Sequence, residues 1–135
     1  MISTKLSLRH YMLAFALVVA ATLLLIAIIA VYGRHMPMSA STLQNISNKL
    51  ASNDPTEVLG ALQFVHERPI EPRLRPFIEQ LLVDDNPHVR ASAASAIGRF
   101  RDARSEASLL QMTDDCSPRV VDEVHRALHT VRNRS

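Results

Sequence analysis

The stretch that most constrains the fold is Tyr11 to Tyr32, YMLAFALVVAATLLLIAIIAVY, whose 22 residues include no charge, amide or proline. At about 1.5 Å of rise per residue, such a helix is roughly 33 Å long, enough to cross a hydrocarbon core of about 30 Å. Tyr11 and Tyr32 stand at its ends, where an aromatic ring can keep its hydroxyl in the headgroup layer. The sequence therefore predicts a transmembrane helix over residues 11–33.

A cleaved secretory signal is the alternative interpretation of this stretch, because Lys5 and Arg9 precede it. Signal cores usually hold about 7 to 15 apolar residues and end in a small-x-small site, whereas this run is longer and ends in bulky residues. An uncleaved anchor is favoured. Lys5, Arg9 and the terminal amine precede the span and only Arg34 follows closely, which predicts a cytoplasmic tail over residues 1–10 and an external C-terminal domain.

Small residues share one face of the predicted span. Ala16, Ala20, Ala27 and Ala30, with Leu23 between them, fall within an arc of about 80° at roughly 100° per residue. A stripe of this kind lets a second helix approach closely in lipid, which predicts packing against another membrane-protein subunit. The simpler interpretation is that alanine is common in membrane spans.

The rest of the chain is formally neutral. Lys5 and Arg9 account for the overall charge of +2, because residues 34–135 balance 13 Lys and Arg against 13 Asp and Glu. A neutral domain in a chain with no Trp, four Phe and two Tyr lacks the basic patch and stacking surface of a nucleic-acid binder. The single cysteine, Cys116, cannot form an internal disulfide.

After a linker over residues 34–41, which contains Pro37, three helices begin in the same way. Asp54-Pro55, Asn86-Pro87 and Ser117-Pro118 each place a side-chain oxygen at the N-cap and a proline at the first helical position. Further helices are expected over residues 42–51, 72–83 and 105–113, with Pro76 delaying or kinking the second of these.

An internal repeat relates these segments. Shifting the chain by 31 residues places Asp84, Pro87, Val89, Ala96, Ile97 and Phe100 on Asp115, Pro118, Val120, Ala127, Leu128 and Val131. A period of 31 with two helices per unit predicts an all-α chain in which a short α-solenoid occupies residues 42–135. The series begins and ends on a half repeat, so we expect apolar surface to be exposed at both ends unless a partner or the membrane covers it.

The stretch DDNPHVRASAASAIGRFRD, residues 84–102, resembles the short bacterial HEAT-like repeat, including the variety named for phycobilin lyases. The residues that carry the resemblance are Asp84, Pro87, Val89, Arg90, Ala94, Ala96, Ile97 and Gly98. The third copy departs from this pattern, with Val121 and His129 where the second has Arg90 and Gly98. The resemblance extends over about residues 42–132 and implies a protein-binding scaffold. With the predicted span, it implies a single-pass protein of the bacterial inner membrane whose C-terminal domain is periplasmic or extracytoplasmic.

Few residues suggest chemistry. His125 and His129 have the i, i+4 spacing of a metal pair, and His88 is a possible third ligand from the preceding repeat, but surface histidines explain the pair more simply. Asp84-Asp85 and Asp114-Asp115 resemble catalytic carboxylate pairs, yet their recurrence at the repeat period favours turn roles. No catalytic residue, metal site, cofactor or small-molecule substrate is predicted.

A basic cluster around the second repeat has two interpretations. Arg90, Arg99, Arg101 and Arg104 are a candidate docking site for an acidic protein surface or lipid headgroups. The alternative is a solvated, partly paired face, since Asp102 lies among them.

Two function classes follow from the sequence. The first is a membrane-anchored protein-interaction module, a small accessory or scaffolding subunit of a membrane complex. The second is a chromophore lyase-like enzyme, or an assembly factor related to the HEAT-repeat bilin lyases, which rests on analogy of fold alone. The first is favoured because the domain is short, is tethered, and shows no convergent set of polar catalytic groups.

Overall fold

The computed structural model describes residues 8–33 and 38–133, in which the elements are helices joined by turns, with no strand. The chain divides into two units, Met1–Met36 and Pro37–Ser135. Residues 1–7 and 34–37 lie outside the described part, and with them most of the predicted tail and half of the predicted linker.

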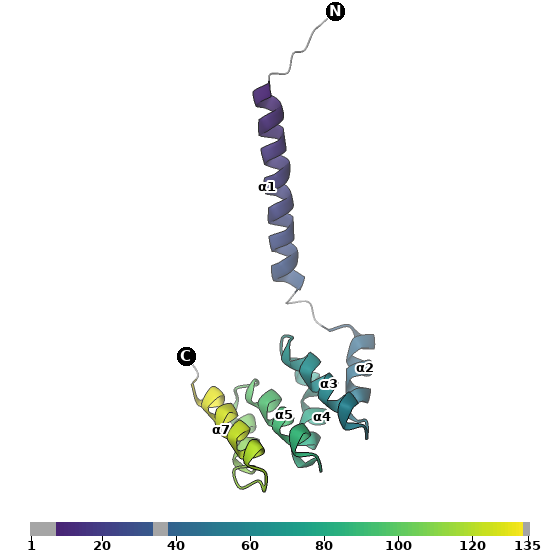
Figure 1. The fold of residues 1–135 in the computed structure, drawn as a ribbon, viewed down its shortest axis with the longest axis vertical. Coiled ribbons are helices and arrows are strands. Elements are labelled where there is room, and N and C mark those ends of the chain that lie inside the picture. The colour runs from purple at the N-terminus through teal and green to yellow at the C-terminus, as the bar shows by residue number, and fades with distance from the viewer. Residues whose placement is uncertain (1–7, 34–37, 134–135) are drawn as a thin grey trace, which may run out of the picture. The chain divides into compact units, whose positions relative to one another are not determined.

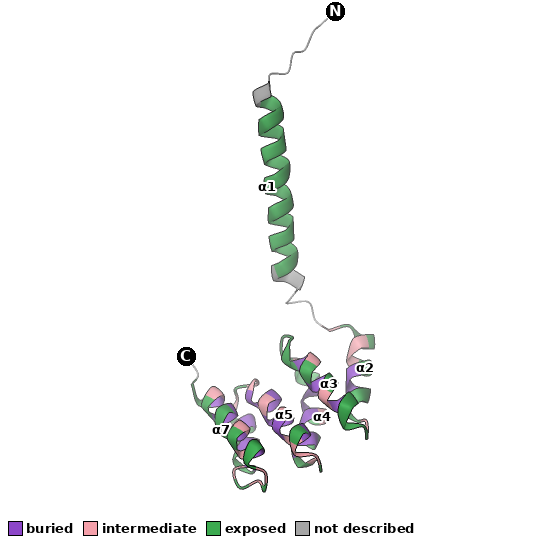
Figure 2. Ribbon diagram, viewed as in Figure 1, coloured by how far each residue is buried: buried purple, intermediate pink, exposed green. Residues whose placement is uncertain are grey.

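The first unit is dominated by one long helix, α1 (Leu8–Gly33) (Figure 1). Within it, His10–Ala30 is long and apolar enough to cross a membrane, with a mean hydropathy of 3.0 and none of the window buried (Figure 2). The hydroxyl of Thr22 donates a hydrogen bond of 2.8 Å to the carbonyl of Val19, so this polar side chain is satisfied inside the helix. By length and composition, α1 is a candidate membrane span.

The second unit contains six α-helices in its described residues. They are α2 (Ala40–Leu50), α3 (Pro55–His66), α4 (Arg75–Gln80), α5 (Pro87–Gly98), α6 (Ala103–Leu110) and α7 (Pro118–Arg132). Two 3-10 turns, Pro72–Leu74 and Leu81–Val83, flank α4. Pro76 lies at the start of α4, so the prediction that it delays this helix is confirmed.

The three repeated helix starts are confirmed. Asp54 accepts a hydrogen bond from the N–H of Thr56 at 2.8 Å, and Asn86 accepts one from the N–H of His88 at 2.9 Å. Ser117 occupies the N-cap of α7, but its side chain makes no capping bond. The carboxylate of Asp115 instead accepts from the N–H of Ser117 at 2.8 Å.

Two predicted helices had wrong bounds, and a local N-cap explains the start of each. Ser39 accepts from the N–H of Thr42, so α2 begins at Ala40, inside the predicted linker. Asp102 accepts from the N–H of Ser105 at 2.8 Å, so α6 begins at Ala103 and not at residue 105. This helix ends at Leu110, before the predicted residue 113.

Helices α3, α5 and α7 lie side by side with α5 in the middle, and α2, α4 and α6 each pack against this row (Figure 1). The central position of α5 explains its composition, because most of its circumference is in contact with neighbours. Its buried residues are mainly small: Val89, Ala91, Ala93, Ala94, Ala96, Ile97 and Gly98. A Cβ added at Gly98 would lie 2.8 Å from the Cβ and 3.1 Å from the Cα of Ala127, so α5 and α7 approach each other closely here.

The prediction that the ends of the repeat series expose apolar surface was wrong. The apolar residues of α7, among them Val120, Val124 and Val131, face inward and are buried, as are Ile46 and Leu50 of α2. Their outward positions are polar: Gln44, Asn45, Asn48 and Lys49 on α2, and Asp122, His125, Arg126 and His129 on α7. Both terminal helices therefore act as polar caps.

Candidate functional site: a groove across three helices

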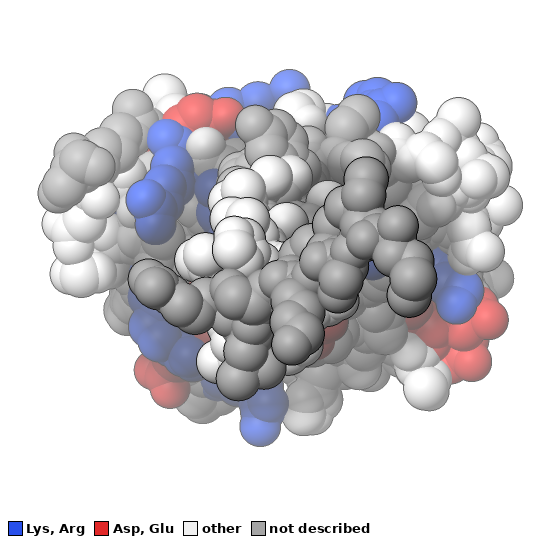
Figure 3. Space-filling model, turned by 90° about the horizontal axis from the view of Figure 1, so that it is seen from above, with Lys and Arg blue, Asp and Glu red and all other residues white. Residues whose placement is uncertain are grey.

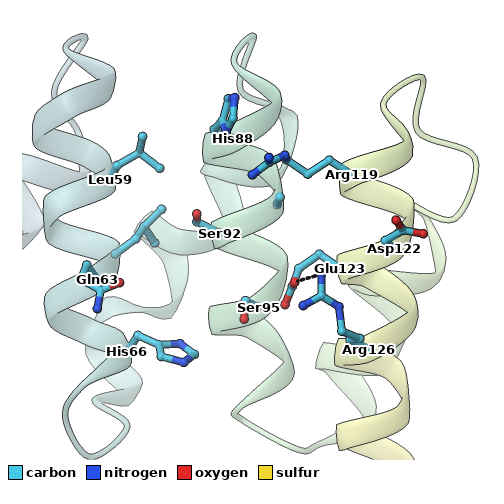
Figure 4. A pocket seen from close by; sticks show the side chains of 12 residues that line it. Leu59, Gln63, His66, His88, Ser92, Ser95, Arg119, Asp122, Glu123 and Arg126 are labelled. Carbon is cyan, nitrogen blue, oxygen red and sulfur yellow. Dashed lines mark ion pairs between the residues drawn. The ribbon is translucent and has the colours of Figure 1, made fainter.

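An open groove of about 780 Å³ crosses α3, α5 and α7 of the repeat unit (Figure 4). It is lined by Leu59, Leu62, Gln63 and His66 of α3, by His88, Ala91, Ser92 and Ser95 of α5, and by Arg119, Asp122, Glu123 and Arg126 of α7. All three helices begin with an N-terminal proline at equivalent positions of the repeat, and the packing of α5 against α3 and α7 sets them side by side.

The floor of the groove is lined with small side chains. Ala91, Ser92 and Ser95 lie on the central helix, while longer side chains stand on both flanking helices (Figure 4). Short residues on a middle helix let another backbone approach it, as in closely packed helix pairs. The floor is thus suited to contact with a polypeptide segment.

Charged groups are concentrated on the α7 wall. The carboxylate of Glu123 forms an ion pair of 2.8 Å with Arg126. Arg119 extends toward His88 of the central helix α5, whereas the carboxylate of Asp122 is turned away from that helix (Figure 4). Among the described residues Arg119 has no ion-pair partner, so its guanidinium is available to a ligand.

The spacing of α5 and α7 is fixed by an ion pair at their N-terminal ends. The guanidinium of Arg90 donates to both carboxylate oxygens of Asp115, at 2.8 and 2.9 Å, and also to the carbonyl of Asp84 at 2.8 Å. The two side chains are only 11% and 13% exposed. The hydrogen bonds from Arg90 lower the pKa of Asp115, and Asp115 in turn raises the pKa of Arg90.

The spacing of α3 and α5 is fixed at the opposite end. Arg99 donates to the carbonyl of Val65 at 2.7 Å and to that of Arg68 at 2.6 Å, and so satisfies carbonyls at the C-terminus of α3. Burial lowers the pKa of Arg99. Arg90 and Arg99 thus tie the central helix to both neighbours.

The four arginines predicted as a docking cluster have separate surroundings. Arg90 and Arg99 are engaged in the contacts above, and Arg104 pairs with Glu79 of α4. Arg101 is exposed and has a φ of 51°, a left-handed conformation that arginine adopts at a cost. In the view of Figure 3, basic and acidic side chains are interspersed and do not separate by sign. A docking role for these arginines stays a prediction.

The predicted histidine pair lies outside the groove lining. His125 and His129 are both exposed, and His129 is in hydrogen-bond contact with Asn133. His88, the possible third ligand, lies in the groove. In the described part of the chain, no group of three or more His, Cys, Asp or Glu side chains is placed to hold a metal ion. The turn roles predicted for Asp84 and Asp115 are confirmed, because each accepts a backbone N–H two residues later.

The stripe of small residues on α1 is fully accessible. Ala16, Ala20, Ala27 and Ala30, with Leu23, are all exposed in the structure, which leaves the predicted packing role untested. Sequence reasoning did not predict the groove. A signal for it was available: Ser92 and Ser95 are polar positions of α5 between its buried alanines.

Comparison with known proteins supports the repeat assignment. A family model for HEAT repeats matches residues 43–129. No curated protein and no solved structure matches the chain.

Proposed function

Because this chain belongs to the HEAT repeat family, whose members generally mediate protein–protein interaction, we propose that it is a membrane-anchored interaction module. Its helix α1 crosses the bacterial inner membrane once, with the N-terminus in the cytoplasm and the repeats outside. The repeats form a short α-solenoid that binds another subunit of a membrane complex, in an accessory or scaffolding role without catalysis.

The observation that carries this proposal is the groove over α3, α5 and α7 in a chain that also has a candidate span. The groove is open, is floored by Ser92 and Ser95, and is framed by fixed contacts of Arg90 and Arg99. A preformed surface of this kind binds at a smaller entropic cost than one that must first be ordered.

The short connection between the two units restricts the partner. Six residues separate Gly33, the last residue of α1, from Ala40, the first residue of α2. A connection of this length tethers the repeats to whatever holds α1. A membrane protein, or a segment held near the membrane, is therefore the favoured partner.

Site-specific photocrosslinking in native membranes tests the proposal. The full chain would carry a photoreactive amino acid at Ser92 in the groove, and a matched control would carry it at Ala107, an exposed position of α6. We expect a crosslinked membrane protein from Ser92 and none from Ala107. We also expect the chain to remain in the membrane after a carbonate wash.

Two results would contradict the proposal. Release of the chain by carbonate would exclude an integral anchor. Recovery of the chain alone from Ser92-labelled membranes, at its normal expression level, would exclude a stable subunit that uses the groove.

A further inference from the structure

We propose that the groove over α3, α5 and α7 binds an acidic amphipathic helix of a partner protein, with carboxylates of that helix held by Arg119 and His88. This inference rests on the proposed function and names the chemistry of the partner segment. It follows from the shape of the groove and from the charges left unpaired along it.

The shape matches a helix. Helices packed side by side are about 8–10 Å apart, so α3 and α7, on either side of α5, are separated by roughly the width of one further helix above α5. Ala91, Ser92 and Ser95 form the floor and leave room for such a helix to approach. A bulky floor would hold it away.

The charge complement favours an acidic ligand. Of the four charged residues on the α7 wall, Glu123 and Arg126 neutralise each other in an ion pair of 2.8 Å. Asp122 also lines the groove, but its carboxylate is turned away from the central helix, whereas Arg119 points toward His88 on that helix (Figure 4). Among the described lining residues, the groups without an ion-pair partner that point into the groove are thus the Arg119 guanidinium and the imidazoles of His88 and His66. Carboxylates are the partners that a guanidinium binds best, through two parallel hydrogen bonds.

The opposite wall favours an amphipathic rather than a uniformly acidic segment. Leu59 is partly exposed on α3 and points into the groove (Figure 4). Gln63 donates to Glu67 at 2.7 Å and is already engaged. A helix with an apolar residue against Leu59 and acidic residues toward α7 satisfies both walls.

Binding of a defined peptide to the full chain in nonionic detergent tests this inference. The probe is a fluorescein-labelled helical peptide of alanine and leucine, about 18 residues long, with glutamates along one edge of its apolar face. Its counterpart has glutamine in place of every glutamate. Fluorescence anisotropy would be recorded for the unmodified chain, for Arg119→Gln, for His88→Gln and for Lys49→Gln, a control at an exposed cation of α2 outside both the groove lining and the arginine cluster.

We expect the glutamate peptide to bind more tightly than the glutamine peptide. Arg119→Gln should weaken it about fivefold, the upper range for an accessible ion pair. His88→Gln should weaken it less, and Lys49→Gln should leave it unchanged. Equal affinity for the two peptides, no binding of either, or an effect of Lys49→Gln equal to that of Arg119→Gln would overturn the inference.

A lipid surface is the other source of anionic groups. If vesicles containing phosphatidylglycerol bind the chain in an Arg119-dependent way and the peptide does not bind, lipid is the occupant and the inference fails. The crosslink from Ser92 distinguishes a failure of this inference from a failure of the proposed function. If the crosslink persists at full yield in Arg119→Gln, the chain is still an interaction module, but its partner is not held by carboxylates at Arg119.

Discussion

Replacing Gly98 by alanine tests whether close approach of α5 and α7 sets the geometry of the repeats. The new Cβ would lie 2.8 Å from the Cβ of Ala127, 3.1 Å from its Cα and 3.3 Å from its carbonyl oxygen. Carbon atoms pack at about 3.5–4.0 Å, so α7 must move away by nearly 1 Å. Two of the three contacts are with backbone atoms, and no side-chain rotation can relieve them.

The expected change in the free energy of unfolding is the difference between two opposing effects. Overpacking of a close contact costs about 1–3 kcal/mol, while replacing a helical glycine by alanine gains up to about 1 kcal/mol. The gain is reduced at Gly98, because it is the last residue of α5. We therefore expect Gly98→Ala to lower the free energy of unfolding by about 1–2 kcal/mol, which corresponds to a melting temperature lower by roughly 5–10 °C in a domain of this size.

Gly60 provides the matched control. It lies in the interior of α3, and a Cβ added there meets no atom within 4 Å. Gly60→Ala should therefore gain about 0.5–1 kcal/mol from helix propensity alone. Both variants of the full chain would be unfolded thermally in nonionic detergent and followed by circular dichroism. A stabilising effect of Gly98→Ala equal to that of Gly60→Ala would refute the close-contact argument.

Three further predictions concern the ion pair between Arg90 and Asp115, the orientation of the chain in the membrane, and the alanine stripe of α1. Arg90 lowers the pKa of Asp115, so this ion pair should stabilise the fold at pH values above 3.8, the unfolded-state pKa, and the stabilisation should be lost as the pH falls through the lowered folded-state pKa. In unfolding measurements over a range of pH, the Asp115→Asn variant should therefore lose less stability on acidification than the unmodified chain. Cys116 is exposed, so a membrane-impermeant maleimide should label it in intact spheroplasts if the domain is external, and labelling only after lysis would reverse the proposed orientation. Ala27→Phe should reduce co-purification of a membrane partner, whereas Leu24→Phe should not; equal recovery from both variants would count against the alanine stripe.

The helix starts and the family were predictable because they depend on local chemistry. An N-cap followed by proline specifies where α3, α5 and α7 begin, whatever packs around them. The period of 31 then placed equivalent residues of successive units together. The start of α7 at Pro118 was predicted correctly, and its apolar residues keep one helical face over its whole length.

The partners of the arginines were not predictable from their neighbours in sequence. Arg90 pairs with a residue 25 positions later, and Arg99 with carbonyls 31 and 34 positions earlier, each about one repeat away. Arginines that are close in sequence therefore contact different elements: Arg90 the turn before α7, Arg99 the C-terminal end of α3, and Arg104 helix α4. The prediction of apolar ends failed for a different reason. It was based on the number of repeats and did not consider the polar residues on the outward faces of α2 and α7, which can be seen in the sequence.

The small residues of α5 face two different environments, the packed core on one side and the open groove on the other. Enlarging a residue should therefore affect stability on the first side and ligand binding on the second. Ala94 is fully buried, so Ala94→Leu should overpack the domain and cost about 1–3 kcal/mol. Ser95 is only partly buried and lines the open groove, so Ser95→Leu should fill the groove with little effect on stability. Binding of the glutamate peptide should then be lost in Ser95→Leu at unchanged melting temperature. Retained binding in this variant would show that the ligand does not reach the floor of the groove, because a leucine side chain occupies the space that an approaching helix needs.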